Sequence, residues 1–142
     1  MTKGSLDQAL VRRHLIALDE ALINLRRHSG IDLEVLEKDR DLRWTIERGL
    51  QLCAQNVLDV ATHIVASAGH DAGDYASAID SLGRIGVLPA AFVARFRGVA
   101  GFRNVLVHAY LSVDLVLVHE LLTRRLDDFA EFARCVELYL SE

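Results

Sequence analysis

The chain has 142 residues, of which 51% are hydrophobic and 25% charged, and its formal net charge is −4. This length predicts one domain, residues 1–142, with a substantial buried core. An acidic net charge excludes a protein that coats nucleic acid as a polycation. A single proline, few aromatic residues and abundant Leu, Ala, Val, Arg and Glu favour an all-helical fold.

The first predicted helix begins at Ser5-Leu6-Asp7-Gln8, which has the spacing of a capping box, and continues to about Arg27. Its hydrophobic residues recur at steps of four and three, as in the seam of a packed antiparallel helix pair. They are Val11, Leu15, Leu18, Leu22 and Leu25. After a stop at Ser29-Gly30, Asp32 is expected to cap a short turn through Leu36.

A second, long helix is predicted from about Asp41 to Ala68, where hydrophobic residues keep the helical period throughout. Gly49 lies on that hydrophobic stripe, and we expect it to allow close approach of another helix. The polar, glycine-bracketed segment 69–74 predicts a loop, and a shorter helix should follow from Tyr75 to Arg84.

Pro89 marks the start of a helix that should run from Ala90 to about Leu111, with a kink at Gly98 and Gly101. Asp114 is then expected to cap a last helix that continues to the C-terminal region. The simplest architecture is an up-and-down helical bundle of about five helices.

Four arginines, at positions 84, 95, 97 and 103, lie in a segment between Asp80 and Asp114 that has no acidic residue. A local cationic region on an acidic protein is what a phosphate-binding site needs. The alternative is that these arginines only decorate solvated helix faces.

Cysteine and most histidine positions give no catalytic or metal-binding pattern. Cys53 and Cys135 are far apart among helical hydrophobic residues, which favours buried free thiols and a reducing cytoplasm. Asp59 and His63 are spaced i, i+4, but two ligands do not make a metal site. We therefore expect neither a metal nor a cofactor. We also expect no membrane span and no N-terminal signal.

The segment from Phe102 to Tyr110 concentrates polar side chains on one side of a predicted helix. On a helical wheel, Arg103, Asn104, His108 and Tyr110 share one arc of about 160°. The same arc also holds Val107 and Leu111, which favours a cleft or a subunit interface over open solvent. The opposite arc predicts a core face, formed by Phe102, Val105, Leu106, Ala109 and Val113.

Arg103 and His108 together suit the cleavage of RNA. Arginine is permanently charged and binds phosphate through a fork of donors, and histidine transfers protons near neutral pH. Because RNA carries its own nucleophile, the 2′-OH, cleavage requires a base, an acid and a cation but no metal. One helix supplies one histidine for two proton-transfer roles. A homodimer that brings two such helices together would supply both.

The spacing Arg103-x4-His108-Ala109-Tyr110 resembles the R-x4-H-x-Y motif of the HEPN superfamily. The sequence around this motif is most similar to that of the HepT-like branch, whose toxins are paired with minimal nucleotidyltransferase antitoxins. A pattern on the second predicted helix supports the resemblance. It consists of Arg43, Glu47, Gln51 and Asp59.

The resemblance implies a homodimeric helical bundle with a metal-independent endoribonuclease site in the cleft between subunits. It implies that Arg103 holds the scissile phosphate, that His108 transfers protons and that Asn104 is a supporting contact. It further implies that the partner nucleotidyltransferase attaches AMP to Tyr110 and so silences the toxin. The expected substrate is RNA, with tRNA as one candidate.

Two other functions remain open at this point. One is a non-catalytic helical dimer that serves as a binding module for the nucleotidyltransferase. The other is a structural bundle in which Arg103 and His108 only satisfy each other's surroundings.

Overall fold

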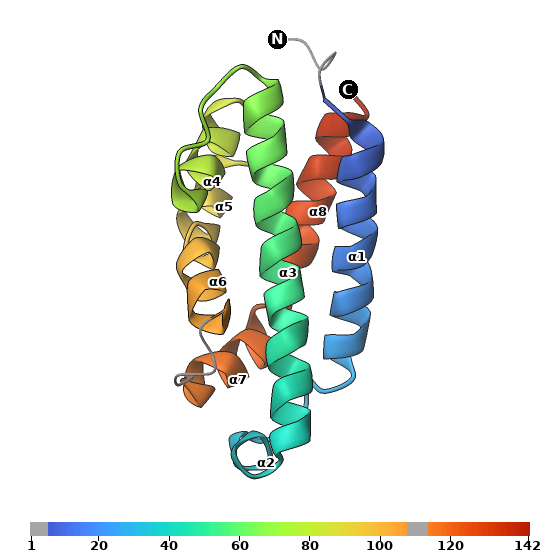
Figure 1. Ribbon diagram of the computed structural model, residues 1–142, viewed down its shortest axis with the longest axis vertical. Coiled ribbons are helices and arrows are strands. Elements are labelled where there is room, and N and C mark those ends of the chain that lie inside the picture. Colours follow the sequence, from blue (N-terminus) through green and yellow to red (C-terminus); the bar gives the residue numbers. More distant parts are fainter. Residues whose placement is uncertain (1–5, 108–113) are drawn as a thin grey trace.

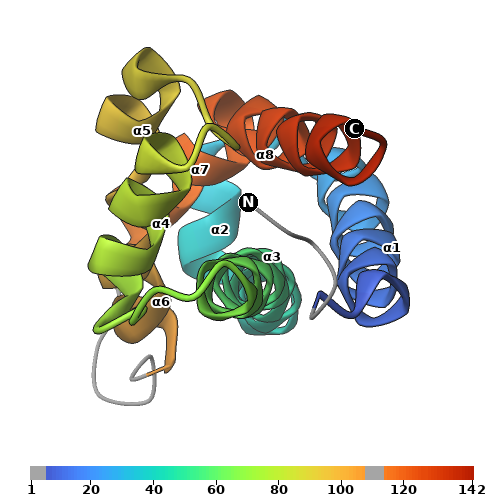
Figure 2. The same ribbon diagram turned by 90° about the horizontal axis from the view of Figure 1, so that it is seen from above.

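A long helix, α3 (Arg40–Ser67), stands at the centre of the structure, and helices pack around it on several sides (Figures 1 and 2). The computed structural model describes residues 6–107 and 114–142. Their regular structure is entirely helical, which confirms the predicted fold class. The other helices are α1 (Gln8–Arg26), α2 (Leu33–Lys38), α4 (Tyr75–Arg84), α5 (Ala90–Phe96), α6 (Val99–Val107), α7 (Leu115–Arg124) and α8 (Leu126–Leu140).

Helix α1 packs along α3, and the residues that make this contact are those that the sequence predicts. All five hydrophobic residues of the predicted seam, from Val11 to Leu25, are buried. A Cβ atom at Gly49 would lie 2.7 Å from Cδ2 of Leu25, which is too close for two carbon atoms. The close helix approach expected at Gly49 is therefore confirmed.

Helix α3 is buried over a wider face than its predicted stripe. Of the predicted stripe, Ile46, Cys53, Val57, Ala61 and Ile64 are fully buried, and so are Leu50, Ala54 and Leu58 beside it. The reason is that α3 contacts α1, α4, α6 and α8, so more than one side of the helix faces the interior (Figure 2). A single stripe is what a helix at the surface of a bundle needs, whereas a central helix needs apolar residues on most sides.

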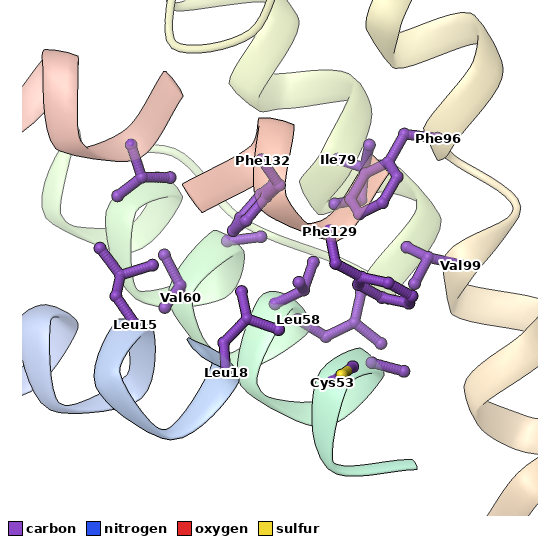
Figure 3. Close-up of a cluster of buried hydrophobic side chains, with 14 of the residues drawn as sticks. Leu15, Leu18, Cys53, Leu58, Val60, Ile79, Phe96, Val99, Phe129 and Phe132 are labelled. Carbon is purple, nitrogen blue, oxygen red and sulfur yellow. The ribbon is translucent and has the colours of Figure 1, made fainter. Parts of the chain in front are cut away.

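The aromatic part of the core joins α5 to α8. The ring of Phe96 stacks on that of Phe132 at a centroid distance of 5.6 Å and meets Phe129 edge-on at 5.8 Å (Figure 3). Such pairs add to the free energy gained by burying the rings. They fix the end of α5 against the C-terminal helix.

Aspartate side chains cap α1, α3, α4 and α7, although not always where the sequence predicts. Asp32 precedes α2, as expected, but makes no capping hydrogen bond. Asp114 accepts hydrogen bonds from the backbone N–H groups of Val116 and Leu117, as expected. The first helix begins at Gln8, and its N-cap is Asp7, which accepts a hydrogen bond from the N–H of Leu10. Ser5, the expected capping residue, lies outside the described residues.

Two of the predicted helices are divided. The predicted helix from Ala90 is interrupted at Arg97-Gly98, where the expectation was only a kink. The last predicted helix is interrupted at Arg125, whose guanidinium binds the Asp128 carboxylate and the Arg95 carbonyl oxygen. The part of the chain that the structure describes therefore holds eight helices in place of about five.

No helix within residues 6–107 and 114–142 has both the length and the apolar character that crossing a bilayer requires.

Candidate active site

Arg103 lies half-buried on α6, on the side of that helix that faces α3 and α4. Its Nε donates a hydrogen bond to Oε1 of Gln55 at 2.9 Å, and its Nη1 donates to Oδ1 of Asn104 at 3.1 Å. The carbon at the centre of the guanidinium lies 5.4 Å from the centroid of the Tyr75 ring, within the range of a cation–π contact. Three residues from three helices thus surround this charge.

The four arginines of the acid-free segment differ in how their charges are balanced. Arg97 forms an ion pair with Asp80 at 2.9 Å, and Arg95 forms one with Asp128 at 3.2 Å. The Arg97 guanidinium lowers the pKa of the Asp80 carboxyl by hydrogen bonding to it. The predicted cationic region is therefore partly neutralised by acidic residues from outside the segment. Two of the four arginines have no carboxylate partner among the described residues: Arg84, which donates a hydrogen bond to Oγ of Ser81 at 2.8 Å, and Arg103.

Of the four predicted site residues, the structure describes two. Arg103 and Asn104 lie next to each other and are hydrogen bonded, with Asn104 exposed. His108 and Tyr110 lie outside the described residues. The proximity of Gln55 and Tyr75 to Arg103 was not predicted. The signal for Gln55 was weak, because only its neighbour Asp59 belonged to the second-helix pattern.

The opposite face of α6 is only partly a core face. Phe102 and Leu106 are buried, as predicted, but Val105 is 38% exposed and its assignment to the core is wrong. Val105 lines a groove of about 580 Å³ whose walls are formed by residues from α5 to α8. Leu117 and Leu121 of α7 and Phe129 of α8 line the same groove, so Val105 faces this groove and not the packed core.

Residues of the second-helix pattern also organise the start of α3. The Arg43 side chain donates hydrogen bonds to the carbonyl oxygens of Leu36 and Glu37, at 3.3 and 2.7 Å, and so satisfies the end of α2. Glu47 lies one turn later, and its Oε2 atom is buried with no hydrogen-bond partner. Burial raises the pKa of the Glu47 carboxyl, and the Arg43 charge offsets part of that rise.

Replacing Glu47 by glutamine is expected to stabilise the protein at neutral pH. Because the carboxyl has a higher pKa in the folded than in the unfolded chain, its charge weakens folding above the folded pKa, and this penalty disappears below the unfolded pKa. We expect a gain below about 1 kcal/mol at neutral pH, because solvent screens a partly exposed group. Thermal unfolding of Glu47→Gln should show this gain, and the gain should vanish below about pH 4. Glu20→Gln, an exposed change on α1, is the control. If the gain in thermal stability persists in acid, the cost of burying the Glu47 charge is not its cause.

The other candidate chemical groups have structural roles. Cys53 and Cys135 are buried free thiols, as predicted, and burial raises the pKa of Cys53 to about 12. Such a thiol is a poor nucleophile at neutral pH. His119 contacts the carbonyl oxygen of Ile31 at 2.8 Å, and His14 contacts Asn56 at 2.8 Å. His14 thus links α1 to α3, and His119 links α7 to the segment between α1 and α2.

Comparisons with known proteins agree with the fold and with the motif. The family model described as Ribonuclease HepT-like matches residues 6–136. A curated relative, the tRNA nuclease HepT of Aphanizomenon flos-aquae (strain 2012/KM1/D3), is 23% identical over 138 residues, which are 96% of this chain and 93% of the relative.

Two solved structures have the same fold at 18% identity. One is the tri-AMPylated Shewanella oneidensis HEPN toxin in complex with MNT antitoxin, with a TM-score of 0.79 over 90% of this chain and 96% of that chain. The other is YutE, a cytosolic protein of unknown function from Bacillus subtilis, with a TM-score of 0.82 over 96% of this chain and 92% of that chain. Because the family model spans most of the sequence, the resemblance seen in the motif is confirmed, and the chain belongs to the HepT-like ribonuclease family.

Proposed function

We propose that this protein is the toxin of a toxin–antitoxin pair and acts in the cytoplasm as a metal-independent endoribonuclease. The observation that carries the proposal is the state of Arg103, which is held by neutral groups and has no carboxylate partner among the described residues. An arginine held in this way is ready to bind an anion. It lies five positions before His108, in the spacing of the family motif.

In the proposed reaction, one His108 imidazole removes the proton from a ribose 2′-OH, and the resulting oxygen attacks the adjacent phosphorus. The bond from phosphorus to the 5′-oxygen breaks, and that oxygen takes a proton from a second, protonated imidazole. The products are a 2′,3′-cyclic phosphate and a 5′-hydroxyl. Arg103 stabilises the negative charge that accumulates on the phosphate oxygens. Asn104 supports Arg103 through the hydrogen bond at 3.1 Å.

Two proton-transfer groups require two copies of the chain in this proposal. A homodimer with a two-fold axis near the end of α6 would bring together two copies each of Arg103 and His108 in one cleft. RNA is the proposed substrate because the relative from Aphanizomenon flos-aquae is named a tRNA nuclease. That name makes tRNA the first substrate to test.

The proposed partner is a minimal nucleotidyltransferase that acts as antitoxin by attaching AMP to Tyr110. The similar toxin from Shewanella oneidensis is tri-AMPylated and in complex with an MNT antitoxin, which supports this part of the proposal. On the helical wheel, Tyr110 lies within about 20° of Arg103. A bulky anion at Tyr110 would therefore compete with substrate for the arginine.

Replacing the nucleotide on the 5′ side of the cut with its 2′-deoxy form is expected to abolish cleavage at that bond. The reason is that removal of the 2′-OH removes the nucleophile. The measurement is gel analysis of a labelled RNA incubated with purified protein, with a 2′-deoxy substitution several nucleotides away as the control. Continued cutting at the substituted position would overturn the mechanism. If the protein cuts no RNA yet co-purifies with the nucleotidyltransferase, the binding-module function is the correct one.

A further inference from the structure

The side chains that hold Arg103 do so without neutralising it. Gln55 and Asn104 accept its hydrogen bonds through amide oxygens, and Tyr75 contacts it through the face of its ring. Arg95 and Arg97, in contrast, are each paired with an aspartate. An amide oxygen orients a guanidinium by its geometry and carries no net charge, so the full positive charge remains available to a ligand.

Asp59 determines which end of the Gln55 amide faces the arginine. The Asp59 carboxylate accepts a hydrogen bond from Nε2 of Gln55 at 2.7 Å. An ionised carboxylate only accepts hydrogen bonds, so it fixes the NH₂ group of Gln55 on its own side. The Gln55 oxygen is thereby turned towards Nε of Arg103, at 2.9 Å. Asp59, one turn along α3, thus acts on the arginine through the amide.

The guanidinium keeps donors for a substrate. An arginine side chain has five N–H groups in a rigid plane, and two of them are used by Gln55 and Asn104. The other three have no partner among the described residues. These donors lie in the guanidinium plane, a geometry that suits two oxygens of one phosphate, and the Tyr75 ring, 5.4 Å from the guanidinium carbon, takes none of them through a hydrogen bond in the described structure.

We propose that Gln55, oriented by Asp59, is a positioning residue that aims the Arg103 guanidinium at the scissile phosphate while leaving its charge unbalanced. This inference rests on the proposed function and assigns it two residues outside the R-x4-H-x-Y motif. Two properties of Arg103 are involved, the orientation of its guanidinium and its unbalanced charge. Two different substitutions at Gln55 change them separately.

The decisive experiment compares Gln55→Ala with Gln55→Glu in RNA cleavage at several salt concentrations. Gln55→Ala releases the arginine but keeps its charge, so kcat should fall about 10-fold while KM stays within about twofold of the wild type. The salt slope, which is the slope of the logarithm of RNA affinity against the logarithm of salt concentration, should not change. Gln55→Glu retains an acceptor but adds a carboxylate that balances the charge, so KM should rise and the salt slope of RNA binding should fall by about one. The matched controls are Gln8→Ala and Gln8→Glu at the exposed start of α1, which should leave both properties unchanged.

Substitutions at Asp59 test the orientation of the amide. Asp59→Ala should lower kcat in the same direction as Gln55→Ala, because the amide is then free to turn its NH₂ group towards the arginine. Asp59→Asn retains an acceptor oxygen and should recover most of the activity. A purely structural role for Asp59 predicts that loss of kcat follows loss of thermal stability in both variants.

The Arg103 Nε–H NMR signal, assigned by its loss in Arg103→Lys, reports the contact without RNA. Its exchange with water should be slow in the wild type and faster in Gln55→Ala and Asp59→Ala. If Gln55→Ala changes neither this exchange nor kcat while Arg103→Ala is inactive, the positioning role is wrong and the proposed function stands. If Arg103→Ala cuts RNA as the wild type does, the proposed function fails, and this role fails with it.

Discussion

Replacing Arg103 by alanine is expected to lower kcat for RNA cleavage about 10²- to 10³-fold, the range seen when one donor to a developing negative charge is removed. The arginine makes three neutral contacts on a partly exposed helix side, so its loss should leave the helical fold intact. Single-turnover cleavage of a labelled RNA measures the effect, and circular dichroism measures the fold. In cells, induced expression of Arg103→Ala should no longer arrest growth.

The control is Arg12→Ala, which removes an equally charged residue that pairs with Glu137 at 2.8 Å and links α1 to α8. It should cut RNA at the wild-type rate. If Arg103→Ala stays fully toxic, or if Arg12→Ala is equally impaired, the charge at position 103 has no special role in the reaction.

If two subunits share one cleft, as proposed, His108→Ala should show a distinctive behaviour in mixtures with the wild-type chain. The variant alone should lose about 10²- to 10⁴-fold in rate, because a proton-transfer group is missing. If both imidazoles serve one reaction, a dimer with one wild-type and one variant chain is inactive as well. Activity of co-refolded mixtures should then follow the square of the wild-type fraction. A linear dependence would mean that each chain acts alone.

The sequence predicted the first half of the fold closely, because there the residue pattern and the packing agree. The bounds Tyr75–Arg84 were predicted exactly for α4, and those of α3 to within about one residue. The signals were strong in this region, namely an aspartate before each helix and a glycine-rich loop between them.

The second half shows what a local pattern cannot specify. A glycine such as Gly98 inside a helix is compatible with either a bend or a break. Which of the two occurs depends on the packing of Phe96 against other helices. Its ring packs on α8, a contact that spans more than thirty residues of sequence. Nothing near Gly98 carries that information, so the break was not predictable from the segment alone.

In the candidate site, too, the residues close in sequence were predicted and the contacts between distant segments were not. The motif identified Arg103 and Asn104 directly, because family spacing is a local property of the chain. Gln55 and Tyr75 belong to other helices and meet Arg103 only after folding. The helical wheel correctly separated Arg103 from the buried Phe102, but it could not tell that Val105 faces a groove. A wheel gives direction around one helix and says nothing of where neighbouring helices lie.

Co-expression with a neighbouring minimal nucleotidyltransferase is expected to add AMP to the wild-type protein and to relieve growth arrest. Tyr110→Phe should gain no AMP and should remain toxic in the presence of the partner. Intact mass measurement after purification gives the number of added AMP groups. The chain has three tyrosines, and Tyr75→Phe is the matched control for the adduct, because the Tyr75 ring contacts Arg103 in the described part of the chain. If Tyr75→Phe loses the adduct and Tyr110→Phe keeps it, the modified residue is Tyr75 and not Tyr110.

The physical basis of silencing can be tested beyond the presence of the adduct. In the proposal, the phosphate of an AMP attached to Tyr110 would carry a negative charge near Arg103 and would offer oxygens to the same donors that the RNA phosphate would use. AMP-modified protein should therefore bind RNA with a salt slope reduced by about one relative to unmodified protein. In Arg103→Ala the adduct should make little further difference to RNA binding, because the charge that it competes for is already absent. If modification blocks RNA equally well without Arg103, the adduct acts by its bulk, and the arginine is not the group that it occupies.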